Sequence, residues 1–161
     1  MTLDAAKRLR TEGRHEEAQA ILLRLARAHP EDAEIQYAAA CVHDYLGHEA
    51  DAVPFYIAAI AGGLLGDDLR GAYLGLGSTY RTLGRYADAE TALREGLRRF
   101  PDANELKVFL AMVEYNLGRA RSAVEALLRL VAETSADENI RAYREAIAFY
   151  AGDIDRVWSS Q

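Results

Sequence analysis

Few side chains in this sequence could bind a metal ion or act as nucleophiles. They are one cysteine and four histidines: Cys41, His15, His29, His43 and His48. No two histidines stand four residues apart, the spacing that places two zinc ligands on one face of a helix. The sequence also lacks the motifs G-x-x-x-x-G-K, G-x-S-x-G and H-E-x-x-H. We therefore expect no catalytic residue, no metal and no cofactor, and we interpret the histidines as packing or surface residues.

Three glycines, Gly71, Gly75 and Gly77, have a spacing that could suggest a G-x-x-x-G contact between membrane helices. However, no apolar run approaches the roughly 18 residues that a membrane span needs. We interpret Gly77 as a position of close helix packing and Gly75 as the open floor of a groove.

Composition narrows the class of protein. The chain has 161 residues, of which 50% are apolar and 27% charged, as in an ordinary single helical domain. A net charge of −6 disfavours nucleic acid as a partner, because phosphates attract clustered positive charge. The single cysteine cannot form an internal disulfide, and the first ten residues lack the apolar core of a signal peptide. We expect a cytoplasmic protein.

The most strongly patterned stretch runs from Tyr73 to Pro101 and predicts a helix, a turn at Gly84 and a second helix. Its first helix carries residues at positions i, i+3, i+4 and i+7, namely Tyr73, Leu76, Gly77 and Tyr80. Its second helix carries Tyr86, Ala89, Leu93 and Leu97. A lone helical hairpin cannot bury its second face, so we expect the unit to recur.

The unit does recur along the chain. The predicted turn glycines are Gly13, Gly47, Gly84, Gly118 and Gly152. Seven residues before them stand Ala6, Ala40, Gly77, Ala111 and, as an exception, Glu145. Five residues after the first four stand Ala18, Ala52, Ala89 and Ala123. Nine residues after them stand Leu22, Tyr56, Leu93 and Leu127.

These columns resemble the tetratricopeptide repeat, most closely its short bacterial members. The resemblance implies an all-α, right-handed α-solenoid of helix–turn–helix repeats in a single domain, 1–161. We expect four repeats, at about 1–31, 32–66, 67–101 and 102–135, then a capping helix at about 136–151 and a short tail, 152–161. The second repeat is three residues longer, and we interpret Gly62–Asp68 as a longer loop. We expect Asp32, Asp102 and Ser135 to begin helices as N-caps.

The resemblance also implies that the first helices of the repeats line a concave surface that binds peptides or partner helices. The predicted groove residues are Tyr37, Cys41, Tyr45, Leu74, Ser78, Arg81, Phe109, Met112, Tyr115, Tyr143, Phe149 and Tyr150. Apolar and aromatic side chains dominate the C-terminal half of this set, which indicates an exposed apolar patch. Only Lys7 is basic where some family members grip a carboxylate, so we expect no carboxylate clamp.

We therefore predict a protein–protein interaction module that binds a peptide or helix in its concave groove, without catalysis. One alternative is a homodimer formed through the same apolar face. A weaker alternative is an enzyme or small-molecule binder that uses the groove. We expect neither a nucleic acid nor a membrane as a partner.

Overall fold

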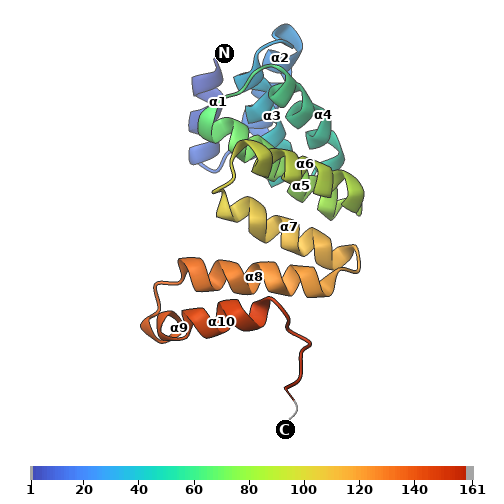
Figure 1. Ribbon diagram of the computed structural model, residues 1–161. Helices are drawn as coiled ribbons and strands as arrows, with labels where there is room; N and C mark the ends of the chain where they lie inside the picture. The colour runs from blue at the N-terminus through green and yellow to red at the C-terminus, as the bar shows by residue number, and fades with distance from the viewer. Residues whose placement is uncertain (1, 159–161) are drawn as a thin grey trace.

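The computed structural model describes residues 2–158, and within this range the chain forms ten α-helices and no strand (Figure 1). They are α1 (Leu3–Thr11), α2 (His15–Ala28), α3 (Ala33–Tyr45), α4 (Glu49–Ala61), α5 (Gly66–Thr82), α6 (Tyr86–Arg99), α7 (Asn104–Asn116), α8 (Ala120–Thr134), α9 (Glu138–Ala142) and α10 (Arg144–Ala151). The predicted all-α fold is confirmed. Met1 and residues 159–161 of the predicted tail lie outside the described residues.

The first eight helices form four antiparallel hairpins, stacked one on the next in chain order (Figure 1). Each hairpin contacts the following one through its second helix, so that α2 packs on α3, α4 on α5, and α6 on α7. The first helices also contact one another in succession, α1 with α3, α3 with α5, and α5 with α7. The arrangement is an α-solenoid.

Four of the five predicted turn glycines have positive φ angles: Gly13 at 78°, Gly47 at 76°, Gly84 at 72° and Gly118 at 79°. Only glycine adopts this conformation at little steric cost, which explains the fixed position of these residues in the repeat. Gly152 follows α10 with a φ of −67° and makes no such turn. The regular repeat therefore ends with the fourth hairpin.

The small-residue columns bring the two helices of each hairpin together. Ala6, Ala18 and Ala89 are 0% exposed, and the other alanines of these columns are also buried. At Gly77, a Cβ atom would lie 2.5 Å from Cγ of Leu93, too close for any real side chain. The interpretation of Gly77 as a close-packing position is thus supported by its surroundings.

The longer second repeat has a different cause from the one predicted. The loops before α3, α5 and α7 are 29–32, 62–65 and 100–103, all of the same length. The insertion lies instead in α5, which has 17 residues, whereas α3 and α7 have 13 each. The extra turn at the start of α5 carries Asp67 and Asp68. The prediction of a longer loop at Gly62–Asp68 was wrong, because a glycine-rich stretch can still begin a helix.

The segment after α8 also differs from the predicted single capping helix. It forms two helices, α9 and α10, which meet at Tyr143. Asp137 caps α9 by accepting hydrogen bonds from the backbone N–H groups of Asn139 and Ile140, so Ser135 is not the N-cap. At α7 the predicted cap Asp102 is likewise replaced, by Ala103, which makes no side-chain bond. Asp32 caps α3 as predicted.

Candidate protein-binding surface

The N-terminal end of the concave face is a polar groove between α1, α3 and the start of α5. Its volume is about 480 Å³, and it is lined by Lys7, Arg10, Thr11, His15, Glu34, Tyr37, Ala38, Tyr45 and Asp68. The rings of His15 and Tyr45 lie against each other, with centroids 3.9 Å apart. Asp68 reaches the groove from the extra turn of α5. The predicted residues Tyr37 and Tyr45 thus meet here.

The middle of the concave face is closed by contacts between repeats two and three. Asp44 accepts hydrogen bonds from the hydroxyls of Tyr56 and Thr79, each at 3.1 Å. The ring of Tyr56 lies where a side chain at Gly75 would be, so the prediction of an open floor at Gly75 was wrong. Burial raises the pKa of the nearby Cys41 thiol, which keeps it protonated and a poor nucleophile at neutral pH.

Four further predicted residues belong mainly to the packing between first helices. Leu74 and Phe109 are partly buried and pack against the larger core cluster. Arg81 donates a hydrogen bond from Nε to Oδ1 of Asn116 at 2.9 Å and so connects repeats three and four. Ser78 is also partly buried. These residues therefore stabilise the shape of the concave face and leave little of their own surface accessible to a partner.

The C-terminal end of the concave face is apolar. Met112 and Tyr115 project from α7 and are exposed, and beside them α8 exposes Val124, Leu127 and Val131. A cavity of about 220 Å³ lies between the two helices, lined by Arg81, Ala111, Met112, Tyr115, Ala123, Val124 and Leu127. We refer to it as the α7–α8 cavity. Sequence reasoning found its α7 side but missed the α8 side.

The remaining predicted residues, Tyr143, Phe149 and Tyr150, are exposed on the last helices. α10 packs mainly on α8, so these side chains do not continue the row of first helices. Phe149 and Tyr150 instead gather around Trp158, with ring centroids 5.5–5.9 Å apart. We refer to these three residues as the aromatic cluster. The predicted patch is therefore divided between α7 and α10, on two sides of α8 (Figure 1).

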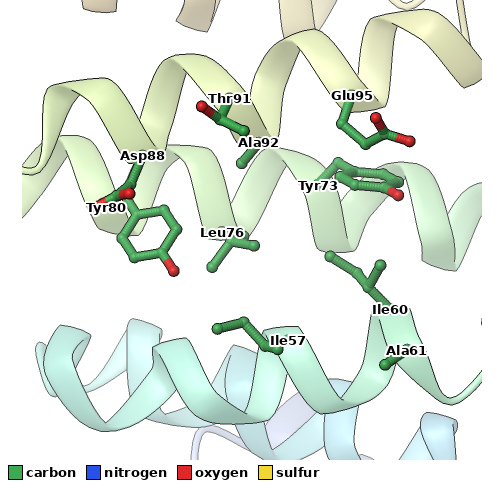
Figure 2. A pocket seen from close by; sticks show the side chains of 10 residues that line it. All are labelled: Ile57, Ile60, Ala61, Tyr73, Leu76, Tyr80, Asp88, Thr91, Ala92 and Glu95. Carbon is green, nitrogen blue, oxygen red and sulfur yellow. The ribbon is translucent and has the colours of Figure 1, made fainter.

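A second groove, which sequence reasoning missed, lies on the convex side between α4 and α6 (Figure 2). Its volume is about 460 Å³, and it is lined by Ile57, Ile60, Ala61, Tyr73, Leu76, Tyr80, Asp88, Thr91, Ala92 and Glu95. α5 provides the floor, and Ile57 and Ile60 form one wall. Ile57 by itself gives no signal for this groove, because repeats one and four carry Leu23 and Leu128 at the equivalent position.

Across residues 2–158, no group of three or more His, Cys, Asp or Glu side chains is placed to hold a metal ion. The carboxylates near the grooves mostly face arginines, as in the pair of Arg85 and Asp88 at 2.8 Å. Within the same range, no helix has the length and apolar character required to cross a bilayer. The surface offers side chains for contact with another molecule.

Comparison with known proteins agrees with this architecture. The family model described as "Tetratrico peptide repeat" matches residues 33–154, which is most of the chain. No curated protein matches the sequence. Among solved structures, one described as "MamA RS-1 ArsTM double mutant" superposes with a TM-score of 0.68 and 18% identity, over 94% of each chain. At that identity the likeness concerns the fold alone.

Proposed function

Because the chain belongs to the tetratricopeptide repeat family, whose members are generally protein-interaction modules, we propose that it is a non-catalytic scaffold that binds a partner on its concave face. The partner is a peptide or helix of another protein. The observation that carries this proposal is the exposure of two aromatic side chains on the concave side, Tyr45 at 68% and Tyr115 at 67%. Aromatic residues at such positions contribute strongly to binding energy and are not needed for hairpin packing.

The two ends of the concave face suit different parts of one partner segment. At the polar end, Lys7 forms only a long ion pair with Glu34, 3.7 Å, and both side chains remain accessible to a partner. At the apolar end, the exposed side chains of Met112 and Tyr115 carry no charge. We propose that the partner segment has a charged portion near α1 and an apolar portion near α7.

The closed middle of the face supports this arrangement because it is rigid. The hydrogen bond from Thr79 to Asp44 joins repeats two and three, and that from Arg81 to Asn116 joins repeats three and four. Tyr56, in the same repeat as Asp44, donates a further hydrogen bond to Asp44. A surface that is already ordered loses little entropy on binding. Together with a net charge of −6 and one free cysteine, these features support a protein partner in the cytoplasm rather than a nucleic acid.

The test has two stages. Partners are first captured from native lysate on the immobilised protein and identified, and a purified partner segment is then titrated by calorimetry. Tyr45→Ala and Tyr115→Ala should each weaken binding about 30-fold, or about 2 kcal/mol. Ile57→Ala in the convex groove is the matched control and should bind normally. If Ile57→Ala weakens binding and both tyrosine variants do not, the partner binds the convex side and the proposal fails.

A further inference from the structure

One side of α8 is uncovered in a way that no inner repeat shows. Nine residues after the turn glycine, Leu22, Tyr56 and Leu93 are 0%, 3% and 0% exposed, but the equivalent Leu127 is 37% exposed. In the inner repeats the next first helix packs on this hairpin face, and Tyr56, for example, touches Gly75 of α5. Val124 and Val131, at helical spacing from Leu127, are also exposed. α8 therefore presents a stripe that is built to pack against a helix.

The last helices of this chain do not cover that stripe. If the segment after α8 packed there as the first helix of a fifth repeat, Glu145 would stand in the small-residue column. Its carboxylate would then be buried without a partner. α10 instead lies on another side of α8, where Arg144 donates from Nε to the carbonyl oxygen of Ala132 at 2.9 Å. Arg121 of α8 also pairs with Asp153 just beyond α10. The stripe and the α7–α8 cavity remain open.

The open cavity and the aromatic cluster match each other in chemistry. The α7–α8 cavity has a largely apolar lining and, at about 220 Å³, lies below the range of roughly 300–1,000 Å³ typical of small-molecule pockets. It fits bulky side chains better than a free ligand. The exposed Phe149, Tyr150 and Trp158 are side chains of this kind, and none of them lines the cavity of its own chain.

The distribution of exposed apolar side chains favours a second copy of the chain as the occupant. Most of the exposed large apolar residues in the described range lie at or after Met112, and none lies in repeat one. Head-to-tail stacking would need an apolar surface at the N-terminal end as well. A two-fold arrangement needs only one patch, because the same surface of each copy meets the other. Acidic and basic residues are nearly balanced in 104–158, so like charges oppose this contact little.

We propose that two copies of this chain associate through their C-terminal ends about a two-fold axis. Each copy packs its aromatic cluster against the α7–α8 cavity of the other and inserts one ring into it. This inference rests on the proposed function, since Met112 and Tyr115 belong to both surfaces. In the dimer, the second copy takes the place of the partner segment's apolar portion at that end. The polar end at Lys7 and Tyr45 stays free in such a dimer.

The first experiment measures molar mass by analytical ultracentrifugation over a wide concentration range. The unaltered chain should approach twice the monomer mass. Leu127→Glu in the cavity and Phe149→Lys in the cluster should each raise the dimer dissociation constant about 30-fold or more. Ile57→Glu, at an exposed apolar site on the convex side, should leave it unchanged. Circular dichroism of every variant should show the same helical content.

The second experiment mixes the two defective variants. A mixed pair of Leu127→Glu and Phe149→Lys keeps one intact cavity and one intact cluster, and its altered pair has opposite charges. The mixture should therefore dimerise more tightly than either variant alone. A monomeric unaltered chain, equal weakening by Ile57→Glu, or a mixture that stays monomeric would overturn the inference.

These outcomes separate the inference from the proposed function. A chain that is monomeric at all concentrations, but binds a captured partner through Tyr45 and Tyr115, overturns the dimer and supports the scaffold. A dimer whose captured partner binds equally well to Tyr45→Ala supports the dimer and contradicts binding on the concave face, because the polar end at Tyr45 stays free in the dimer.

Discussion

The ring of Tyr56 fills the space beside Gly75. Because Gly75 has no side chain, α4 and α5 approach each other more closely here than any larger residue would allow. A Cβ atom at Gly75 would lie 2.6 Å from Cε1 of Tyr56 and closer still to the end of the ring. Tyr56 is 3% exposed, and its hydroxyl is held by Asp44. The ring therefore has little freedom to move aside, and this contact sets the approach of repeats two and three.

We predict that Gly75→Ala destabilises the protein by about 1–3 kcal/mol, the usual cost of overpacking a core. In an unobstructed helix the same change would stabilise by up to about 1 kcal/mol. Gly152→Ala is a suitable control, because a Cβ there meets the flexible end of Arg129 at 3.3 Å and the carbonyl oxygen of Phe149 at an ordinary contact distance of 3.5 Å. Urea denaturation of both variants measures the difference. A Gly75→Ala variant as stable as the unaltered chain would show that the Tyr56 ring can relocate.

The hydrogen-bonded carboxylate of Asp44 gives a prediction about pH. Burial raises the pKa of Asp44 above its ordinary value, although the hydrogen bonds from Tyr56 and Thr79 oppose this shift and the charge of Glu49 adds to it. Between the unfolded and folded pKa values, the folded chain binds more protons at this site than the unfolded chain does. The contribution of Asp44 to stability therefore falls as pH rises through that window.

We accordingly expect Asp44→Asn to be at least as stable as the unaltered chain at neutral pH, because the amide needs no charge to accept a hydrogen bond. The difference between the two proteins should shrink as the pH is lowered from neutral through the range in which Asp44 becomes protonated. Thermal melting followed by circular dichroism across this range tests it. If the difference in melting temperature stays constant with pH, Asp44 has an ordinary pKa.

The fold could be read from the sequence because its determinants are local. A glycine with positive φ at Gly13, Gly47, Gly84 and Gly118 fixes each hairpin, and alanines at constant offsets fix the contact between its helices. Helix ends were harder to place, since several polar residues near each end could serve as the cap. Asp137 rather than Ser135 caps α9, because this helix begins two residues later than predicted.

The candidate site was less predictable because it depends on contacts between repeats. Gly75 looked open in its own helix, and only the neighbouring α4 shows that Tyr56 fills it. Leu127 occupies a column that is buried in three other repeats, and its exposure follows from where α10 packs. Ile57 stands in a column that is also apolar in repeats one and four, so the convex groove depends on the gap between α4 and α6. Periodicity assigns a face to each residue but does not say what covers that face.

The alanine column provides a direct test of the hairpin packing. Ala89 is 0% exposed between α5 and α6, so Ala89→Leu should destabilise the protein by about 1–3 kcal/mol. Ala87, two residues earlier in the same helix, is exposed, and Ala87→Leu should change stability by less than about 0.5 kcal/mol. Denaturant midpoints of the two variants give the comparison. Equal effects at both positions would contradict the packing of α5 against α6 described above.

The last helices give a prediction about the end of the solenoid. Ala132 of α8 and Ala151 of α10 are both nearly fully buried, and Arg144 and Asp153 add polar contacts between the two segments. A chain that ends at Ser135 loses this cover, and the surface exposed on α8 joins the stripe at Leu127. Because unpaired ends of repeat arrays are poorly soluble, we expect aggregation, or a melting temperature lower by at least about 5 °C.

A chain that ends at Trp158 is the matched control for this truncation. It keeps α10 on α8 and leaves the aromatic cluster of Phe149, Tyr150 and Trp158 intact. Its melting temperature should therefore stay within about 2 °C of the full chain. Light scattering and thermal melting of the two truncated chains decide the matter. If the shorter chain is soluble and has the same melting temperature as the control, the packing of α10 on α8 does not stabilise the solenoid.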